Sequence, residues 1–348
     1  MTDIQRTRII RKEIQKSYQL FRKKYPILNH QNAIGFTIFI VCLLAATMLG
    51  YLWWIDSISL FFLIVGNAFL FGILHELEHD LIHWMYFKEN KWIHHTMLLL
   101  IWLARPLTIN PWIRRIFHYH HHSFSGTLHD VEERGVTNGE KWTWKRLLFT
   151  PDLVIGNLLR VRKLFEDISS EVQKGHLSLD TGNQLKKYGI LALIPITIIS
   201  HVILYAFTIE CFLGVLRTFF EWNIQVPLWI SSTLDTLKPL IYIVLLPNLL
   251  RQFCLHLITS NLHYFGDVEK GNVMEQTQIV NAWWTFPLQI FCFFFGWTHA
   301  IHHFVVNETF YIRHFTRKKA HQIMKEYGVR FNDFASMKRA NRYHPVQE

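Results

Sequence analysis

The feature that most limits how this chain can fold is a series of long apolar segments with few charges. Residues 34–54 form an uncharged run that, at about 1.5 Å per residue, matches a hydrocarbon core of about 30 Å. An uncharged run over residues 58–74 follows after a short polar break, and residues 188–207 and 240–258 are two further candidates. We therefore predict an all-α integral membrane protein with four transmembrane helices in two hairpins.

The composition agrees with a membrane protein and argues against other classes. Half of the 348 residues are hydrophobic (50%) and the mean hydropathy is +0.13, which is rare among soluble globular proteins. The net charge of +10 does not indicate nucleic-acid binding, because the basic residues alternate with apolar runs and do not form one stripe. The four cysteines lie in apolar surroundings without metal or redox spacing, so no disulfide framework is expected: Cys42, Cys211, Cys254 and Cys292.

Two shorter apolar segments, residues 97–104 and 282–297, are predicted to lie in the membrane interface. The first is too short to cross a bilayer, and Pro287 interrupts the second. If either crossed, the histidine clusters described below would lie on opposite sides of the membrane. Trp283, Trp284 and Trp297 are the residue type that gathers at membrane interfaces.

The basic residues predict the orientation, because Lys and Arg accumulate in short cytoplasmic segments. Residues 1–33 contain eight of them, and residues 141–187 and the segment after residue 307 contain nine each, whereas residues 208–239 contain only Arg217 and Lys238. We predict that the termini and histidine clusters are cytoplasmic, in a bacterial inner membrane or the endoplasmic reticulum. The expected units are a basic N-terminal segment (1–33), a membrane domain (34–311) and a basic C-terminal tail (312–348), with a polar, partly helical loop at 123–187.

Three histidine clusters follow or separate the apolar segments, and at helical pitch each can aim two or three imidazoles at one point. Imidazole is a common ligand for zinc, copper and iron. A single four- or five-coordinate ion cannot use all of these rings, so we predict a histidine-rich site with more than one metal. The clusters contain eight histidines at ligand spacing: His75, His79, His118, His121, His122, His299, His302 and His303.

The first cluster also matches a rival motif. His75-Glu76-Leu77-Glu78-His79 has the H-E-x-x-H pattern of zinc peptidases, in which the glutamate acts as general base. That pattern is short and leaves the other two clusters unexplained, so a membrane zinc peptidase is a remote alternative. Glu76 and His79 also form the E-x-x-H unit of di-iron bundles, but the other clusters supply histidine and no partner glutamates.

The order H-x3-H, H-x2-HH, H-x2-HH, interleaved with paired membrane helices, resembles the integral-membrane fatty acid desaturase and hydroxylase superfamily over residues 34–311. The resemblance implies two non-haem irons on the cytoplasmic ends of the helices. It also implies that dioxygen and two electrons from an external donor are used to attack a C–H bond of an acyl chain. The eight cluster histidines would be ligands, and His263, after the last span, is expected as a ninth.

Several nearby residues are further candidates. His83 continues the face of His79, and His256 lies seven residues before His263, so both are possible metal ligands. Glu76 and Asp80 are candidate catalytic residues that would act through the ligands. Asp80, Asp130 and Asp267 follow histidines and either accept imidazole N–H groups or lie in solvated loops.

The resemblance leaves the reaction open among desaturation, hydroxylation and oxidative decarboxylation of a free fatty acid to a terminal alkene. We favour a fatty acid desaturase, with a membrane lipid or fatty acid as substrate. Because no haem or flavin segment is visible, the electron donor is expected to be a separate ferredoxin-like protein or small cytochrome, which the basic surface suits.

Overall fold

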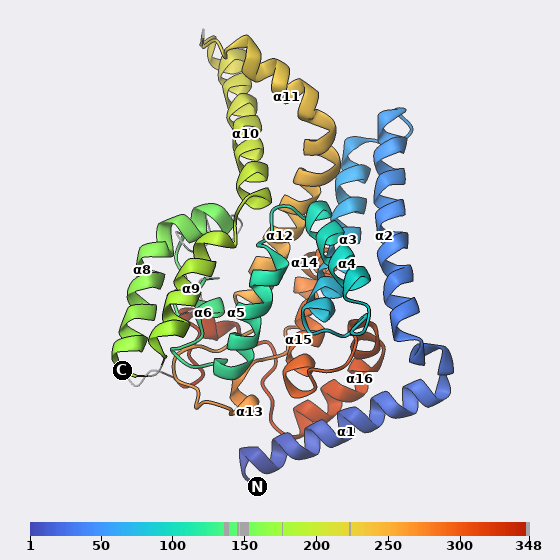
Figure 1. Cartoon of the computed structure of the whole chain (residues 1–348), viewed down its shortest axis with the longest axis vertical. Coiled ribbons are helices and arrows are strands. Elements are labelled where there is room, and N and C mark those ends of the chain that lie inside the picture. The colour runs from blue at the N-terminus through green and yellow to red at the C-terminus, as the bar shows by residue number, and fades with distance from the viewer. Residues whose placement is uncertain (136–138, 145, 147–152, 176, 223, 346–348) are drawn as a thin grey trace.

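The computed structural model of the chain is helical (Figure 1). It describes residues 1–135, 139–144, 146, 153–175, 177–222 and 224–345. Isolated β-bridges, His263 with Thr277 and Ile279 with Phe331, are the extended pairings in this described part. The predicted all-α class is therefore confirmed.

Four helical segments in the described part of the chain are long and apolar enough to cross a membrane, as predicted. The first two are α2 (Gln31–Trp54) and α3 (Leu60–Ile82), which pack side by side as a hairpin. The third is α10 (Ile196–Phe220) and the fourth runs over Leu228–Thr259. Both hairpin turns lie at the same end of the molecule in Figure 1, and α1, α15 and α16 lie at the other end.

The bounds of the third and fourth spans differ from the prediction. The third starts at Ile196 and not at residue 188. Residues 188–191 belong to α9 (Leu179–Leu191), which ends four residues before Pro195, and Pro195 disfavours helix in the residue before it. The fourth combines α11 (Leu228–Leu240), a π-helical turn (Ile241–Leu245) and α12 (Leu246–Thr259). Pro239 lies directly before this wider turn, which accommodates its missing N–H without ending the helix.

The two segments predicted for the interface do not form spanning helices. Residues 97–104 belong to the short helix α4 (Lys91–Ala104). Residues 282–297 divide into a 3₁₀ turn (Trp283–Thr285), α14 (Phe286–Phe291) and the start of α15 (Phe295–Phe304). This broken segment approaches α3 closely at Gly72, where an added Cβ would lie 2.6 Å from the carbonyl oxygen of Phe291.

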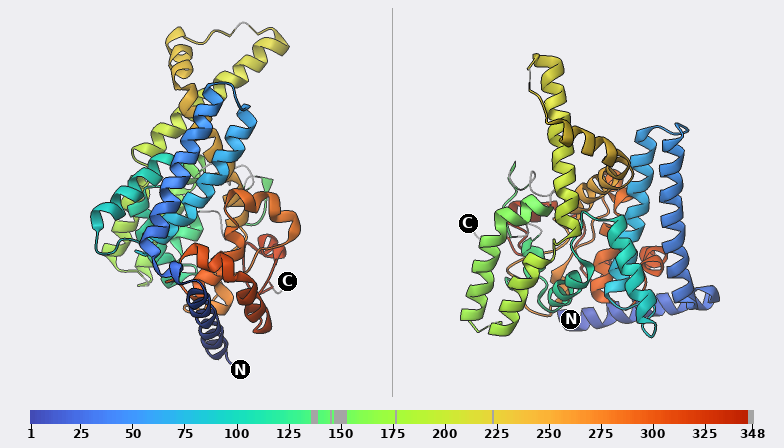
Figure 2. Two further views of the ribbon diagram at one scale, coloured as in Figure 1. Left: turned by 90° about the vertical axis from the view of Figure 1, so that its right-hand side faces the viewer. Right: turned by 45° about the horizontal axis from the view of Figure 1, so that its top comes forward.

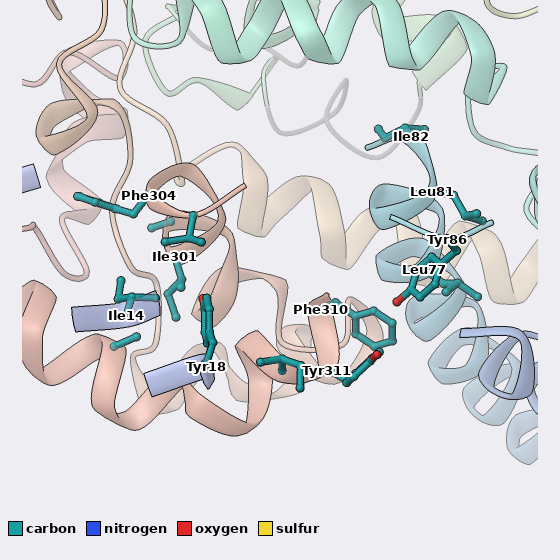
Figure 3. Close-up of a cluster of buried hydrophobic side chains, with 14 of the residues drawn as sticks. Ile14, Tyr18, Leu77, Leu81, Ile82, Tyr86, Ile301, Phe304, Phe310 and Tyr311 are labelled. Carbon is teal, nitrogen blue, oxygen red and sulfur yellow. The ribbon is translucent and has the colours of Figure 1, made fainter. Parts of the chain in front are cut away.

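The core joins α3 to the C-terminal helices. Leu77 and Leu81 of α3 belong to the same buried cluster as Ile301 of α15, and Figure 3 shows these side chains among their neighbours. Helix α1 (Asp3–Lys24) crosses beneath α16 (Phe310–Glu326) and buries Ile14 and Tyr18 in this cluster. Each fully buried aliphatic side chain contributes about 1.5–3 kcal/mol, so the histidine-bearing end of α3 is held firmly.

The predicted polar loop 123–187 is largely helical in its described residues. Helix α6 (Val131–Gly135) is followed by α8 (Leu153–Gln173), which packs against α9. Ser178 caps α9 through the N–H of Thr181 at 3.1 Å. This layer, separate from the spanning hairpins in Figure 2, covers one side of α5 (Pro111–Phe124), the helix of the second histidine cluster.

Candidate metal centre

Eight buried histidines form two adjacent groups of four, and within each group the potential ligand atoms lie within 4.8 Å of one another. In the first group, the Nε2 atoms of His79 and His118 are 3.0 Å apart and those of His83 and His302 are 3.1 Å apart. The groups are His79, His83, His118 and His302, and His121, His263, His299 and His303.

Helical spacing explains how the second and third clusters each contribute to both groups. On α5, His118 points to the first group and His121 to the second, and on α15, His302 points to the first while His299 and His303 point to the second. His263 enters from the segment after α12, with its Nε2 2.7 Å from that of His299. The ninth predicted histidine therefore lies where the resemblance placed it, although its role as a ligand stays a prediction.

Three other candidate ligands lie outside the two groups. His122 is close to both: its Nε2 lies 3.1 Å from that of His118 and 3.0 Å from that of His302 in the first group, and its ring centroid lies 4.8 Å from that of His303 in the second. His75 is buried and accepts a hydrogen bond at Nδ1 from Arg105, and its Nε2 has no partner among the described residues. His256 lines the neighbouring cavity. Ligand roles for these three stay predictions, whereas His83, a secondary candidate in the sequence, lies within the first group.

Carboxylates orient two of the imidazoles. The Nδ1 atoms of His118 and His121 donate to Glu132 at 3.1 Å and Asp130 at 2.8 Å. A carboxylate on Nδ1 leaves the Nε2 lone pair free for a metal. Of the two alternatives given for Asp130, the structure has the acceptor of an imidazole N–H. Glu132 was missed, although an acidic run directly after the second cluster was a usable signal.

The other predicted acids do not contact imidazoles. Asp80 accepts from Tyr86, from the backbone N–H of Phe310 and from Arg313. Glu76 also contacts Arg313, at 3.4 Å, and Arg313 lies 2.7 Å from Nδ1 of His302. Asp80 follows neither of the two alternatives given for it, because it is buried in α3 and Arg313 lies between it and His302. A catalytic role for Glu76 or Asp80 stays a prediction.

For Asp267, the alternative of a loop acid agrees with the structure, which places it in a bend outside the helices. Its carboxylate accepts from the backbone N–H groups of Tyr343 and His344, each at 2.8 Å. It therefore fastens the C-terminal segment and does not orient a ring. The predicted domain boundary at Tyr311 falls inside α16, so residues 312–345 continue directly from the packed core.

Burial keeps most of these rings neutral. It lowers the pKa of His118, His263, His299 and His303 well below the usual range. His121 is the exception: burial opposes its charge, but Asp130 and neighbouring glutamates raise its pKa to about 10. Neutral imidazole is the form that binds metal. Two neutral imidazoles whose Nε2 atoms lie about 3 Å apart form a hydrogen bond through a single proton. The Nε2 of His302 has two such neighbours, His83 and His122, and one proton cannot bond all three nitrogens. The donor set therefore fits metal ions.

A cavity of about 190 Å³ lies beside the two groups. One part of its wall is formed by imidazoles, including His79, His121 and His299, and another part carries three arginines: Arg105, Arg114 and Arg251. Sequence reasoning missed these arginines and their partner Glu78. For Arg251 and Glu78 the available signal was a charged residue inside an apolar span, which is rare and marks an interior or functional position.

Comparison with known proteins agrees with this geometry. The search of curated proteins finds no significant match. The family model described as fatty acid desaturase matches residues 53–335, a range that contains every histidine of the two groups. The chain has four apolar helices of spanning length and buried histidine groups that could hold metal. We conclude that the chain belongs to the fatty acid desaturase family, whose members are oxidoreductases.

Proposed function

We propose that this protein is a membrane-bound di-iron oxidoreductase that inserts a double bond into a fatty acyl chain. The observation that carries the proposal is the pair of adjacent, buried four-histidine groups. Two groups argue for two metal ions. An all-imidazole donor set with adjoining carboxylates suits iron, and family membership favours a lipid or fatty acid substrate.

When bound, iron would supply the activation of dioxygen and the oxidation of a C–H bond. The protein's part is to hold and orient the imidazoles through Asp130 and Glu132, to exclude water by burial, and to place the chain. Placement decides which carbon reacts, because rates fall steeply with misalignment. The overall reaction takes two hydrogens from adjacent carbons, and with two electrons and two protons reduces dioxygen to two waters.

The electrons must come from a separate carrier, and we propose an acidic ferredoxin-like protein or a small cytochrome. The basic segments at residues 1–33 and after residue 307 support this partner by charge complementarity. The same segments support cytoplasmic termini and a cytoplasmic metal centre. The division into residues 1–33, 34–311 and 312–348 is part of this proposal.

The zinc peptidase alternative receives no support from the geometry. A general base in that reaction must face the metal-bound water, but Glu76 contacts Arg313. A single zinc would also leave one complete four-histidine group without a role.

The experiment is metal analysis with oxygen uptake and lipid profiling. Purified protein is expected to contain about two irons per chain. The variants His121→Ala and His302→Ala should lose most of the iron and the activity. His321→Ala is the control, because His321 belongs to neither group and bonds the carbonyl of Trp297. Mass spectrometry separates the outcomes: loss of two hydrogens for desaturation, gain of one oxygen for hydroxylation, and a terminal alkene for decarboxylation. Full activity in either ligand variant overturns the proposal.

A further inference from the structure

Arg251 of α12 is a buried cation without a counter-charge in contact among the described residues. Its side chain is fully buried, and it lines the cavity beside the histidine groups. Its Nε donates to Asn248 at 3.3 Å. Both Nη atoms are buried and have no hydrogen-bond partner in the described part of the chain. A guanidinium in that state costs stability unless an anion joins it.

The neighbouring acid cannot serve as that anion. Glu78 is fully buried and already accepts from Arg105 at 2.7 Å and from Arg114 at 2.6 Å. The acids on the cavity wall, Glu132 and Glu133, lie next to imidazoles of the two groups. Among the described residues, the three arginines of the wall therefore share the single carboxylate of Glu78, and this part of the cavity can accept an anionic ligand.

The side chain of Arg251 is also held in position. Asn248, which accepts from its Nε, is itself fixed by hydrogen bonds from its amide to the carbonyls of Ala104 and Val244, at 2.8 and 2.9 Å. This arrangement orients the two Nη groups as a fixed pair of donors. Two parallel donors match the two oxygens of a carboxylate, which guanidinium groups bind in a bidentate manner.

We propose that Arg251 binds the carboxylate of an unesterified fatty acid, which would be the form of substrate that this enzyme takes. The inference rests on the proposed function, because it uses the same cavity. A thioester or an oxygen ester is uncharged at the carbonyl end and does not neutralise Arg251.

This binding mode has a consequence for the reaction. Because Arg251 and the imidazoles of His79 and His299 line one cavity, the carboxyl end of the chain lies nearer the metal centre than its middle does. Oxidation is then directed to the first carbons of the chain. Within the proposed desaturation, the double bond is then expected near the carboxyl end and not in the middle of the chain.

The test measures binding, so it does not depend on turnover. Purified protein is titrated with hexadecanoic acid, its methyl ester and its coenzyme A thioester, and the affinities are compared for wild type, Arg251→Met and Arg251→Lys. Arg217→Met is the matched control, because Arg217 pairs with Glu210 in α10 and lies outside the cavity wall. His121→Ala is included to detect a carboxylate that binds the metal directly.

We expect wild type and Arg217→Met to bind the acid about 30-fold or more tightly than the ester, because a buried charge pair is worth that much. Arg251→Met should lose this preference while keeping its affinity for the ester, and Arg251→Lys should keep part of it. Arg251→Met should also unfold no earlier than wild type without ligand, because it removes an unpaired buried charge.

Three results would overturn the inference: equal affinity of wild type for acid and ester, an unchanged acid preference in Arg251→Met, or tighter binding of the thioester. Loss of the preference in His121→Ala but not in Arg251→Met would assign the carboxylate to the metal instead. If Arg251→Met fails to fold, Arg251→Lys tests the inference instead. Its preference for the acid over the ester should be smaller than that of wild type, and an unchanged preference would overturn the inference. Iron content and oxygen uptake of the same preparations test the proposed function separately, since an iron-free protein can still prefer the acid.

Discussion

Replacing Glu78 by Gln removes one negative charge from between two guanidinium groups and leaves the shape of the side chain nearly unchanged. Glu78 and Arg105 are both fully buried, and Arg114 is 13% exposed. The variant leaves Arg105 and Arg114 beside Arg251 with no carboxylate between them. Removing one partner of a buried ion pair costs about 3–5 kcal/mol, and the upper half of that range applies because Arg105 has no access to water.

The assay is unfolding in detergent, followed by tryptophan fluorescence. Membrane proteins often unfold irreversibly, so the half-life at a fixed temperature is measured beside the midpoint. Asp235→Asn is the matched control, because it removes a carboxylate of the same kind from an exposed ion pair with Lys238, and such pairs contribute little. The double variant Glu78→Gln/Arg105→Met should recover part of the loss, since it removes an unpaired cation. If Glu78→Gln unfolds together with wild type and Asp235→Asn, the reasoning about buried charge in this cavity is refuted.

Three further predictions concern the metal groups and the C-terminal segment. His83→Ala should lose at least one of the two proposed irons while His321→Ala keeps both, because His83 belongs to the first group; full iron in His83→Ala, measured by elemental analysis, would contradict this. Asp130→Asn should weaken metal binding by about 10–100-fold, as is usual when the partner of a ligating imidazole is lost. Asp267→Asn should not weaken it, because the carboxylate of Asp267 accepts from backbone N–H groups of the C-terminal segment. Competition with a chelator measures the metal affinity of both variants. Burial opposes the charge of Asp333, but Arg339, Tyr264 and Arg330 lower its pKa, so its contribution to stability is complete above the unfolded value of about 3.9 and is lost as the pH falls through the lower folded value. Proteolysis of the C-terminal segment should therefore accelerate in acid in wild type, and this acceleration should be smaller in Asp333→Asn.

The spans show where pattern reasoning succeeds and where it stops. Runs such as residues 34–54 are recognisable because length and apolarity follow directly from the thickness of a bilayer. The fourth span was predicted too short because Lys238 and Pro239 resemble a helix boundary. The structure continues through them with a π-helical turn, and that solution depends on packing against α3, which no local pattern encodes.

For the metal centre, too, the sequence predicts some features and leaves others open. Spacing within one helix indicates which imidazoles share a face, so the clusters on α5 and α15 were recognisable as ligand candidates. Spacing cannot show how rings from four segments combine. It could not show that His83 joins the first group while His75 stays outside it, or that Arg313 separates Asp80 from His302.

The sequence by itself determined that this chain is an all-helical membrane protein with a histidine-rich candidate metal centre, because apolar length and helical periodicity are local properties of the chain. The tertiary structure alone decided the division into two histidine groups that could hold metal, the acids that orient them and the cavity in which Arg251 lies. Those features depend on contacts between residues far apart in sequence. The cost of burying a charge becomes visible only when every possible partner is in place, and the unpaired guanidinium of Arg251 is the clearest example.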